Sequence, residues 1–315
     1  MSATRRLSLV VLVTTVVLAA CDGSPPAETD GEASATPSDS SGPAVQGHIL
    51  YSRITGTDAA EFFVANPDGS DETPFAPGKA FEARNLSPDG SRLALVAEVG
   101  LGPIVGGTVE VDGSGFRLFP HLDGSLNLAC GVWASPRRLA CEGWDESDPS
   151  RKGIYTVRAS DGRDLQRLTR ERDVPCDYSP DGTQLAFVRT GANPQLGSLM
   201  VMDAEGGDAD PLLNDVALSG IACDWSPDGR SILVATRDGT MVTVSPSSSE
   251  VTPVVGEGID GFALGGTWSL DGSHILFSMT FQGDLWDVYV VAADGSNLTR
   301  ITDTVDIEEG SIWLP

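Results

Sequence analysis

The amino-acid sequence predicts an all-β fold, a six-bladed β-propeller built from four-stranded antiparallel blades. Its 36 Gly and 20 Pro residues interrupt nearly every window that could otherwise form a long helix. Hydrophobic residues make up 40% of the chain, which is enough to bury a core. A turn motif also recurs at nearly constant spacing, and a period of this size is typical of propellers and solenoids.

The recurring motif is a Ser-Pro-Asp-Gly turn, preceded by an aromatic residue or Leu and followed by an apolar strand. Pro fixes φ, the Asp side chain accepts backbone N–H bonds, and Gly adopts the positive φ that ends the turn. Two of the six copies are degenerate. The residues before the turns, spaced 47, 45, 47, 43 and 45 positions apart, are Leu86, Trp133, Tyr178, Trp225, Trp268 and Trp313.

The elements of each repeat follow in a fixed order. The strand that carries the marker residue leads through the turn to a second apolar strand, such as residues 185–188. A third strand such as residues 154–157 and an Asp-Gly turn at residues 160–162 come next, and a fourth strand such as residues 165–169 ends the repeat. Four short antiparallel strands in 43 to 47 residues correspond to one propeller blade.

The two ends of the repeat region complement each other. Residues 48–53, 61–65 and 72–75 supply three strands of a first blade but no marker strand before them. The marker strand around Trp313 has no strands after it. We therefore predict that the C-terminal strand pairs with the N-terminal blade, which closes the ring and removes its open sheet edges.

This pattern resembles the TolB-like propeller repeats, a WD-repeat-like class marked by the Trp-Ser-Pro-Asp-Gly turn, over residues 48–315. The third copy departs from it, because Ala134-Ser135-Pro136-Arg137 lacks the Asp-Gly, and the last copy stops at Pro315. The resemblance implies an extracytoplasmic propeller that acts by binding or scaffolding. In that family the partners include a peptidoglycan-associated lipoprotein. A blade repeat fixes a fold and leaves the function open.

The N-terminus predicts export and a lipid anchor. Arg5 and Arg6 precede an uncharged apolar segment at residues 7–20, as in a signal peptide. That segment ends at Cys21 in Leu-Ala-Ala-Cys, which resembles the lipobox of bacterial lipoproteins; an ordinary secretory signal is the alternative. Residues 1–20 are then the signal peptide, residues 21–44 are the lipidated Cys and an acidic tether too polar to fold, and residues 45–315 are the propeller.

Export and charge limit the location and the partners. We expect the protein on the outer face of the bacterial membrane or in the periplasm, attached through its lipid alone. The chain has 45 acidic and 20 basic residues and a net charge of -25. This balance argues against nucleic-acid binding, which needs clustered Lys and Arg. We expect a monomer whose partner is an envelope protein or a cell-wall component.

Four cysteines remain once Cys21 is assigned to lipid, and an even number outside the cytoplasm suggests disulfides. They are Cys130, Cys141, Cys176 and Cys223. If Val132 pairs with Leu139, the first two lie directly opposite one another in the third blade. The other two occupy the same position in consecutive blades, where they either bridge neighbouring inner strands or stay free and buried.

The sequence offers little evidence for a metal or for catalysis. One acidic turn could hold calcium, but the repeat already requires a turn there, so we predict no cofactor and keep calcium as a minor alternative. Its acids are Asp203, Glu205, Asp208 and Asp210. The three His residues are scattered, and no Gly-x-Ser-x-Gly or phosphate-binding loop is present, so we assign no catalytic residue.

The loops between second and third strands vary most among the blades, and variable loops on a rigid ring are the usual place for recognition. In the third blade this loop, expected at residues 142–152, places an aromatic residue among acids. We expect it to contact a basic partner or a cell-wall component. Its candidate residues are Glu142, Trp144, Asp145, Glu146 and Asp148, with the Trp either an exposed anchor or folded back onto its blade.

The leading hypothesis is thus a membrane-anchored lipoprotein whose propeller is a non-enzymatic binding or scaffold module of the cell envelope. A cell-wall or carbohydrate-active enzyme, or a glycan-binding protein, that uses an acidic channel or the variable-loop face is the alternative. A purely structural role in the envelope is a third hypothesis.

Overall fold

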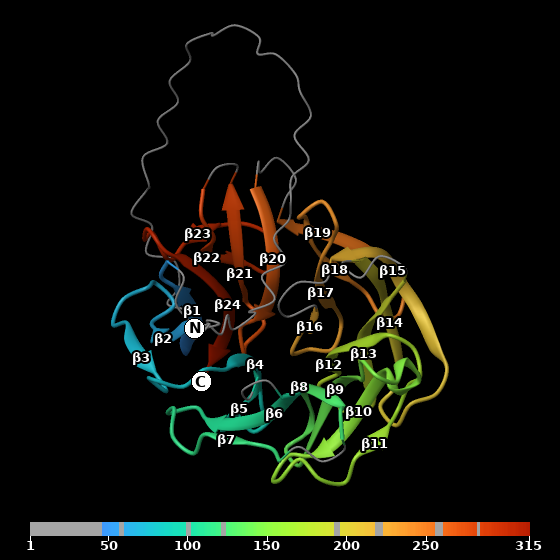
Figure 1. Cartoon of the computed structure of the whole chain (residues 1–315). Coiled ribbons are helices and arrows are strands. Elements are labelled where there is room, and N and C mark those ends of the chain that lie inside the picture. The colour runs from blue at the N-terminus through green and yellow to red at the C-terminus, as the bar shows by residue number, and fades with distance from the viewer. Residues whose placement is uncertain are drawn as a thin grey trace, which may run out of the picture. The chain divides into compact units, whose positions relative to one another are not determined.

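A computed structural model describes residues 46–56, 60–98, 102–120, 124–191, 196–217, 223–255, 261–281 and 284–315. Within these ranges the chain forms six sheets, each of four antiparallel strands, arranged in a ring (Figure 1). The same ranges contain one short 3-10 helix, η1 (Pro149–Arg151), and no helix that is long and apolar enough to cross a bilayer. The predicted six-bladed propeller is confirmed. Cys21, the predicted signal peptide and the tether lie outside the described residues.

In each of the first three blades the strands follow one another from the centre of the ring outward. Blade 1 contains β24 (Ile307–Leu314), β1 (His48–Ile54), β2 (Glu61–Ala65) and β3 (Thr73–Phe75). Blade 2 contains β4 (Glu82–Leu86), β5 (Arg92–Glu98), β6 (Ile104–Glu110) and β7 (Arg117–Leu118). Blade 3 contains β8 (Asn127–Ser135), β9 (Arg138–Trp144), β10 (Gly153–Arg158) and β11 (Gln166–Arg167).

The remaining three blades repeat this order. Blade 4 contains β12 (Asp173–Tyr178), β13 (Gln184–Thr190), β14 (Leu196–Asp203) and β15 (Ala209–Ala217). Blade 5 contains β16 (Cys223–Trp225), β17 (Ile232–Ala235), β18 (Met241–Val244) and β19 (Val251–Val255). Blade 6 contains β20 (Gly261–Trp268), β21 (His274–Phe281), β22 (Asp287–Ala292) and β23 (Thr299–Arg300).

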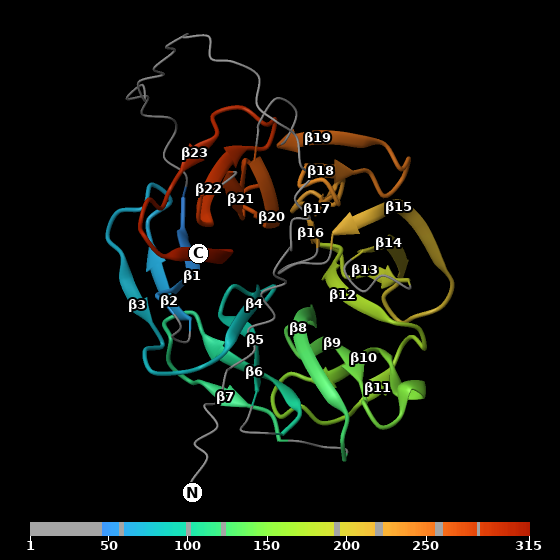
Figure 2. The same cartoon turned by 45° about the horizontal axis from the view of Figure 1, so that its top comes forward.

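The first strands of the blades form the inner wall of the ring. Each contacts the first strands of both neighbouring blades, in the order β4, β8, β12, β16, β20 and β24 (Figure 2). Two marker tryptophans also join neighbouring blades: Trp133 Nε1 donates to the Asn85 carbonyl and Trp313 Nε1 to the Thr267 carbonyl, both at 3.1 Å. The evenly spaced markers therefore mark the innermost strands and the junctions between blades.

The Ser-Pro-Asp-Gly copies form the turns that the sequence predicts. In blade 4, Asp181 Oδ1 accepts hydrogen bonds from Ser179 Oγ at 2.6 Å and from the Thr183 N–H at 3.0 Å. Gly182 follows with a φ of 71°, a conformation in which any other residue would be strained. Copies in blades 2, 5 and 6 use the same Ser-to-Asp hydrogen bond.

The predicted register between the first two strands of blade 3, β8 and β9, is wrong by one residue at Val132. Val132 lies opposite Ala140 rather than Leu139, which pairs with Trp133 instead. A β-bulge between Cys130 and Val132 then shifts the pairing by one residue, so that Cys130 still lies opposite Cys141. A bulge adds one unpaired residue to one strand, and an alternating pattern alone does not reveal it.

Ring closure takes place in blade 1, as predicted. β1 pairs antiparallel with β24, with His48 opposite Leu314 and Ile54 opposite Ile307. An ion pair reinforces the closure, because Arg53 Nε donates to Glu308 Oε1 at 2.8 Å and the Glu308 side chain is fully buried. The two ends of the propeller are thus joined by a backbone ladder and by a buried charge pair.

We expect Arg53→Met to destabilise the propeller by about 3 kcal/mol, because it leaves the buried Glu308 carboxylate without its cation. The double variant Arg53→Met/Glu308→Leu should recover most of that loss, since no buried charge then lacks a partner. Urea unfolding followed by fluorescence measures both free energies. A double variant as unstable as the single one would contradict the role assigned to this pair.

Candidate functional site: the blade 3 loop and the inner-strand carboxyls

The blade 3 loop is shorter than the sequence predicts. β9 extends to Trp144, so Glu142 lies within a strand, paired with Ala129 on one side and Ile154 on the other. Its side chain is half-buried, and burial raises the pKa of its carboxyl. The assignment of Glu142 to the binding loop is therefore wrong, because the strand continues through the residues where a loop was expected.

Asp145 holds the loop in shape instead of facing a partner. Its residue surface is only 4% exposed. Its carboxylate accepts hydrogen bonds from Ser147 Oγ at 2.6 Å, from Ser125 Oγ at 2.8 Å and from Arg151 Nη1 at 2.8 Å. These bonds, from Ser147 above all and then from Ser125, hold the pKa of Asp145 well below its usual range. Its predicted place among exposed recognition acids is wrong.

The rest of the loop presents a small acidic surface. Glu146 and Asp148 are exposed, and Trp144 is half-buried with its Nε1 donating to Glu146 Oε1 at 3.1 Å. Asp148 caps η1 by accepting from the Ser150 N–H at 3.1 Å. Trp144 therefore lies between its two predicted positions, with part of its ring packed and its polar edge turned to an exposed acid.

The acidic turn considered for calcium joins β14 to β15, where the repeat predicts a turn. Its four carboxylates, Asp203, Glu205, Asp208 and Asp210, are all exposed. Within the described residues no group of three or more His, Cys, Asp or Glu side chains is placed to hold a metal ion.

Two inner-strand aspartates, which the sequence analysis did not single out, connect three blades. Asp177 Oδ2 accepts from the Trp225 backbone N–H at 2.9 Å, and Asp224 Oδ2 accepts from the Trp268 N–H at 2.7 Å. Each carboxyl thus reaches from its own blade to the innermost strand of the next. A signal was present, since both residues stand immediately before a marker aromatic residue.

These two carboxyls also interact with each other. Burial raises the pKa of both carboxyls above the usual aspartate range, and the charge of Asp177 raises the pKa of Asp224 further. Two carboxyls that share one site cannot both ionise easily, so the pair keeps a proton to higher pH than an isolated Asp. Burial likewise raises the pKa of Glu309 in β24.

Raised carboxyl pKa values are common at catalytic sites, but ion-pair and structural networks produce them too. Asp177 and Asp224 already bind backbone N–H groups of neighbouring blades. Asp177 and Asp224 therefore stabilise the junctions between blades 4, 5 and 6. The side chains of Glu142 and Glu309, by contrast, form no hydrogen bond within the described part of the chain. The last two are thus carboxyls with a raised pKa that no side-chain hydrogen bond engages.

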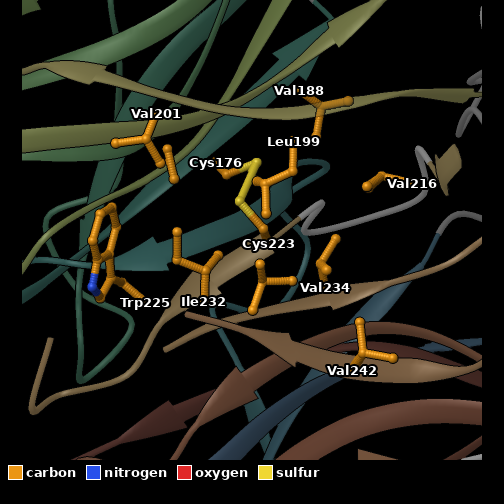
Figure 3. Close-up of a cluster of buried hydrophobic side chains, with 12 residues drawn as sticks. Cys176, Val188, Leu199, Val201, Val216, Cys223, Trp225, Ile232, Val234 and Val242 are labelled. Carbon is orange, nitrogen blue, oxygen red and sulfur yellow. A yellow bond between two sulfur atoms is a disulfide. The ribbon is translucent and has the colours of Figure 1, made fainter. Parts of the chain in front are cut away.

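Disulfides lie beside these groups. Cys130–Cys141 joins β8 to β9 within blade 3, and Cys176–Cys223 joins β12 to β16 across the junction of blades 4 and 5. The second disulfide lies in a buried apolar cluster that also contains Leu199 of β14 (Figure 3). Cys176 sits at a β-bulge, where the pairing of β12 with β13 skips one residue.

Comparison by sequence connects the chain with TolB proteins. No family model matches the sequence. A protein of Anaeromyxobacter dehalogenans (strain 2CP-C), the Tol-Pal system protein TolB, is 33% identical over 166 residues, which is 51% of this chain. The match covers 37% of the length of that relative.

Comparison by structure gives the same result for the fold. TolB from Acinetobacter baumannii superimposes with a TM-score of 0.68 and 16% identity, over 87% of this chain and 68% of the other. An oligogalacturonate lyase from Vibrio parahaemolyticus also matches, with a TM-score of 0.50 and 11% identity over 77% and 71% of the two chains. The resemblance to TolB-like propellers that the repeats indicate is confirmed, and the same fold also supports enzymes.

The Asp177–Asp224 pair should make stability depend on pH. Because the folded state raises both pKa values, it binds protons more tightly than the unfolded chain. This tighter proton binding contributes its full stabilisation below about pH 4, the pKa of an aspartate in the unfolded chain. The stabilisation is lost as the pH rises through the raised pKa values of the folded state. Asp177→Asn retains an oxygen for the Trp225 N–H and removes one titrating group.

We therefore expect the melting temperature of Asp177→Asn, relative to the wild type, to increase between pH 5 and pH 8. Calorimetry at several pH values measures this difference, and the corresponding difference in the free energy of unfolding changes by at most about 1.4 kcal/mol per pH unit for one group. Asp208→Asn, a change at an exposed turn residue, is the control and should give a nearly constant difference. A constant difference for Asp177→Asn as well would rule out this role.

Proposed function

We propose that the protein is an exported lipoprotein whose TolB-like propeller binds a protein partner in the cell envelope and performs no catalysis. The observation that carries this proposal is the agreement of two comparisons: half of the chain matches a TolB sequence, and the ring superimposes on a TolB structure. The name of the relative places that protein in the Tol-Pal system. By analogy, we assign this chain an envelope protein as its partner.

The surface of the ring is consistent with binding. The inner-strand aspartates hold neighbouring blades together, so the scaffold is rigid where the blades meet. The blade 3 loop then presents Glu146, Asp148 and the edge of Trp144 from a backbone that Asp145 fixes. Exposed acids beside an aromatic ring suit a basic segment of a partner, through ion pairs and cation–π contacts. A cationic cell-wall component has the same chemistry.

One observation favours a second function, a glycan-binding protein or a carbohydrate-active enzyme. Glu142 and Glu309 are carboxyls whose pKa burial raises, and a raised pKa suits a general acid. Incubating the purified protein with cell-wall fragments and acidic oligosaccharides tests this directly. Turnover that Glu142→Gln or Glu309→Gln abolishes would replace the binding proposal, whereas no turnover supports it.

The anchor has its own test. If lipid is attached to Cys21, Cys21→Ser should move the protein from the membrane fraction to the soluble extracytoplasmic fraction and abolish incorporation of labelled fatty acid. Fractionation and metabolic labelling measure the two effects, and the substitution leaves residues 46–315 unchanged. If the variant stayed in the membrane fraction, the ordinary secretory signal would be the better interpretation.

We expect the variant Glu146→Lys/Asp148→Asn to reduce the amount of cross-linked envelope partner at least fivefold in intact cells. The Lys reverses one exposed charge, and Asn preserves the cap on η1 while removing the other. Asp145 is left intact because its loss would disorder the loop and obscure the result. Quantitative mass spectrometry of the purified cross-linked complexes gives the measurement.

A matched control is Glu205→Lys/Asp208→Asn, which makes the same change in net charge at the exposed turn between β14 and β15. This control should retain the partner at the wild-type level. Equal losses in both variants would show a general effect of net charge, and no loss in either would exclude the blade 3 loop as the contact.

A further inference from the structure

Basic residues are unevenly distributed in this acidic protein. Nine of its 20 Lys and Arg residues fall between residues 137 and 172, which include most of blade 3. Several of them belong to the turn face, the edge of the ring that carries the turns from first to second strand and from third to fourth strand of each blade. Together with two arginines of blade 2 they form an arginine patch, composed of Arg92, Arg117, Arg137, Arg138, Arg158 and Arg163.

Hydrogen bonds and strand pairing bring these side chains together across two blades. Arg92 of blade 2 donates to the Pro136 carbonyl in blade 3 at 2.8 Å. Arg117 of blade 2 donates to the Ser160 carbonyl, in the other turn of blade 3. Arg138 and Arg158 lie directly opposite one another on β9 and β10. The patch therefore spans the junction of blades 2 and 3 on the turn face.

Two guanidinium groups in the patch form no hydrogen bond or ion pair within the described residues. Arg138 pairs with Asp164 at 2.6 Å and Arg158 with Asp161 at 2.7 Å. Arg137 and Arg163 are exposed, and within the described residues their side chains form no hydrogen bond or ion pair. The turn that carries Arg163 also contains Asp161, which interacts electrostatically with it, and Asp164.

The backbone fixes both arginines in place. The Arg137 carbonyl accepts from the Ala159 N–H at 2.8 Å, and the Arg163 carbonyl accepts from the Arg158 N–H at 2.7 Å. Both residues therefore stand on ordered turns. A charged group presented from an ordered turn loses less conformational freedom on binding than one on a flexible segment.

The patch lies where the sequence departs from its own repeat. In blade 3 a two-residue turn, Pro136–Arg137, replaces the Ser-Pro-Asp-Gly turn. The corresponding turns of the other blades carry an aspartate, namely Asp89, Asp181, Asp228 and Asp271. The third- to fourth-strand turn of the neighbouring blade 4 also has exposed acids, including Glu205 and Asp208. Blade 3 thus presents an exposed arginine at the turn where the other blades present an aspartate.

We propose that the arginine patch is a second interaction surface, which binds a short acidic peptide segment of a protein partner. Guanidinium groups bind carboxylates through paired hydrogen bonds, as Arg158 already does with Asp161. A short segment fits better than a membrane or a long polyanion, because the net charge of -25 repels extended anionic surfaces beyond the patch. This proposal goes beyond the proposed function and concerns a different surface of opposite charge.

The test uses the intact mature protein and a fluorescein-labelled peptide of about ten Glu residues. Fluorescence anisotropy should show binding that weakens as salt is added, since exposed ion pairs are screened. Arg137→Glu/Arg163→Glu should bind the peptide about tenfold more weakly than the wild type. Both substituted side chains are exposed, and an unchanged melting temperature will show that the variant is folded.

The matched control is Arg230→Glu/Arg237→Glu, which reverses two exposed arginines of blade 5 and changes the net charge equally. It should bind the peptide within about twofold of the wild type. Equal weakening in both variants, or no binding by the wild type, would overturn the proposal, as would binding to phosphatidylglycerol vesicles in place of the peptide. Cross-linking through the blade 3 loop is measured separately, so either surface can fail alone.

Discussion

Closure of the ring is the constraint on which the rest of the structure depends. A propeller blade has two sheet edges, and the inner edge, formed by the innermost strand, packs against the neighbouring blades. Here the last strand, β24, pairs with β1, and the buried Arg53–Glu308 ion pair lies in the same ladder. Because the chain ends are held in this way, every innermost strand has a neighbour on both sides. The other junctions between blades can then form around a closed ring.

Those junctions determine which polar groups are left for function. At the junctions of blades 4, 5 and 6, the carboxyls of Asp177 and Asp224 bind backbone N–H groups of the following blade, and a disulfide crosses the first of them. Groups used in this way are poor candidates for catalysis even though their pKa values are raised. Recognition is therefore left to the outer surfaces, where loops and turns can vary without opening the ring.

Much of the fold could be predicted from the sequence, because the marker residues and their turns act locally and repeat at a regular period. The blade count and the pairing of the last strand with the first blade follow from that period. The errors have non-local causes. The exact partner of Val132 depends on a bulge at the neighbouring residue, and the burial of Asp145 depends on Ser125, twenty residues away. Trp225, whose N–H binds Asp177, lies in the next blade, and this contact becomes visible only in three dimensions.

The distribution of charge connects the two surfaces. Asp181 and its equivalents show that many acids serve the turns, so the net charge overstates the acidity available to a partner. In blade 3 the first turn lacks this aspartate and has Arg137 instead. There the arginine patch forms on the turn face. The exposed acids Glu146 and Asp148 belong to the same blade but to its other end, between the second and third strands. Blade 3 thus presents the exposed acids Glu146 and Asp148 at one end and the exposed arginines Arg137 and Arg163 at the other, so it can contact chemically different segments on the two faces of one ring.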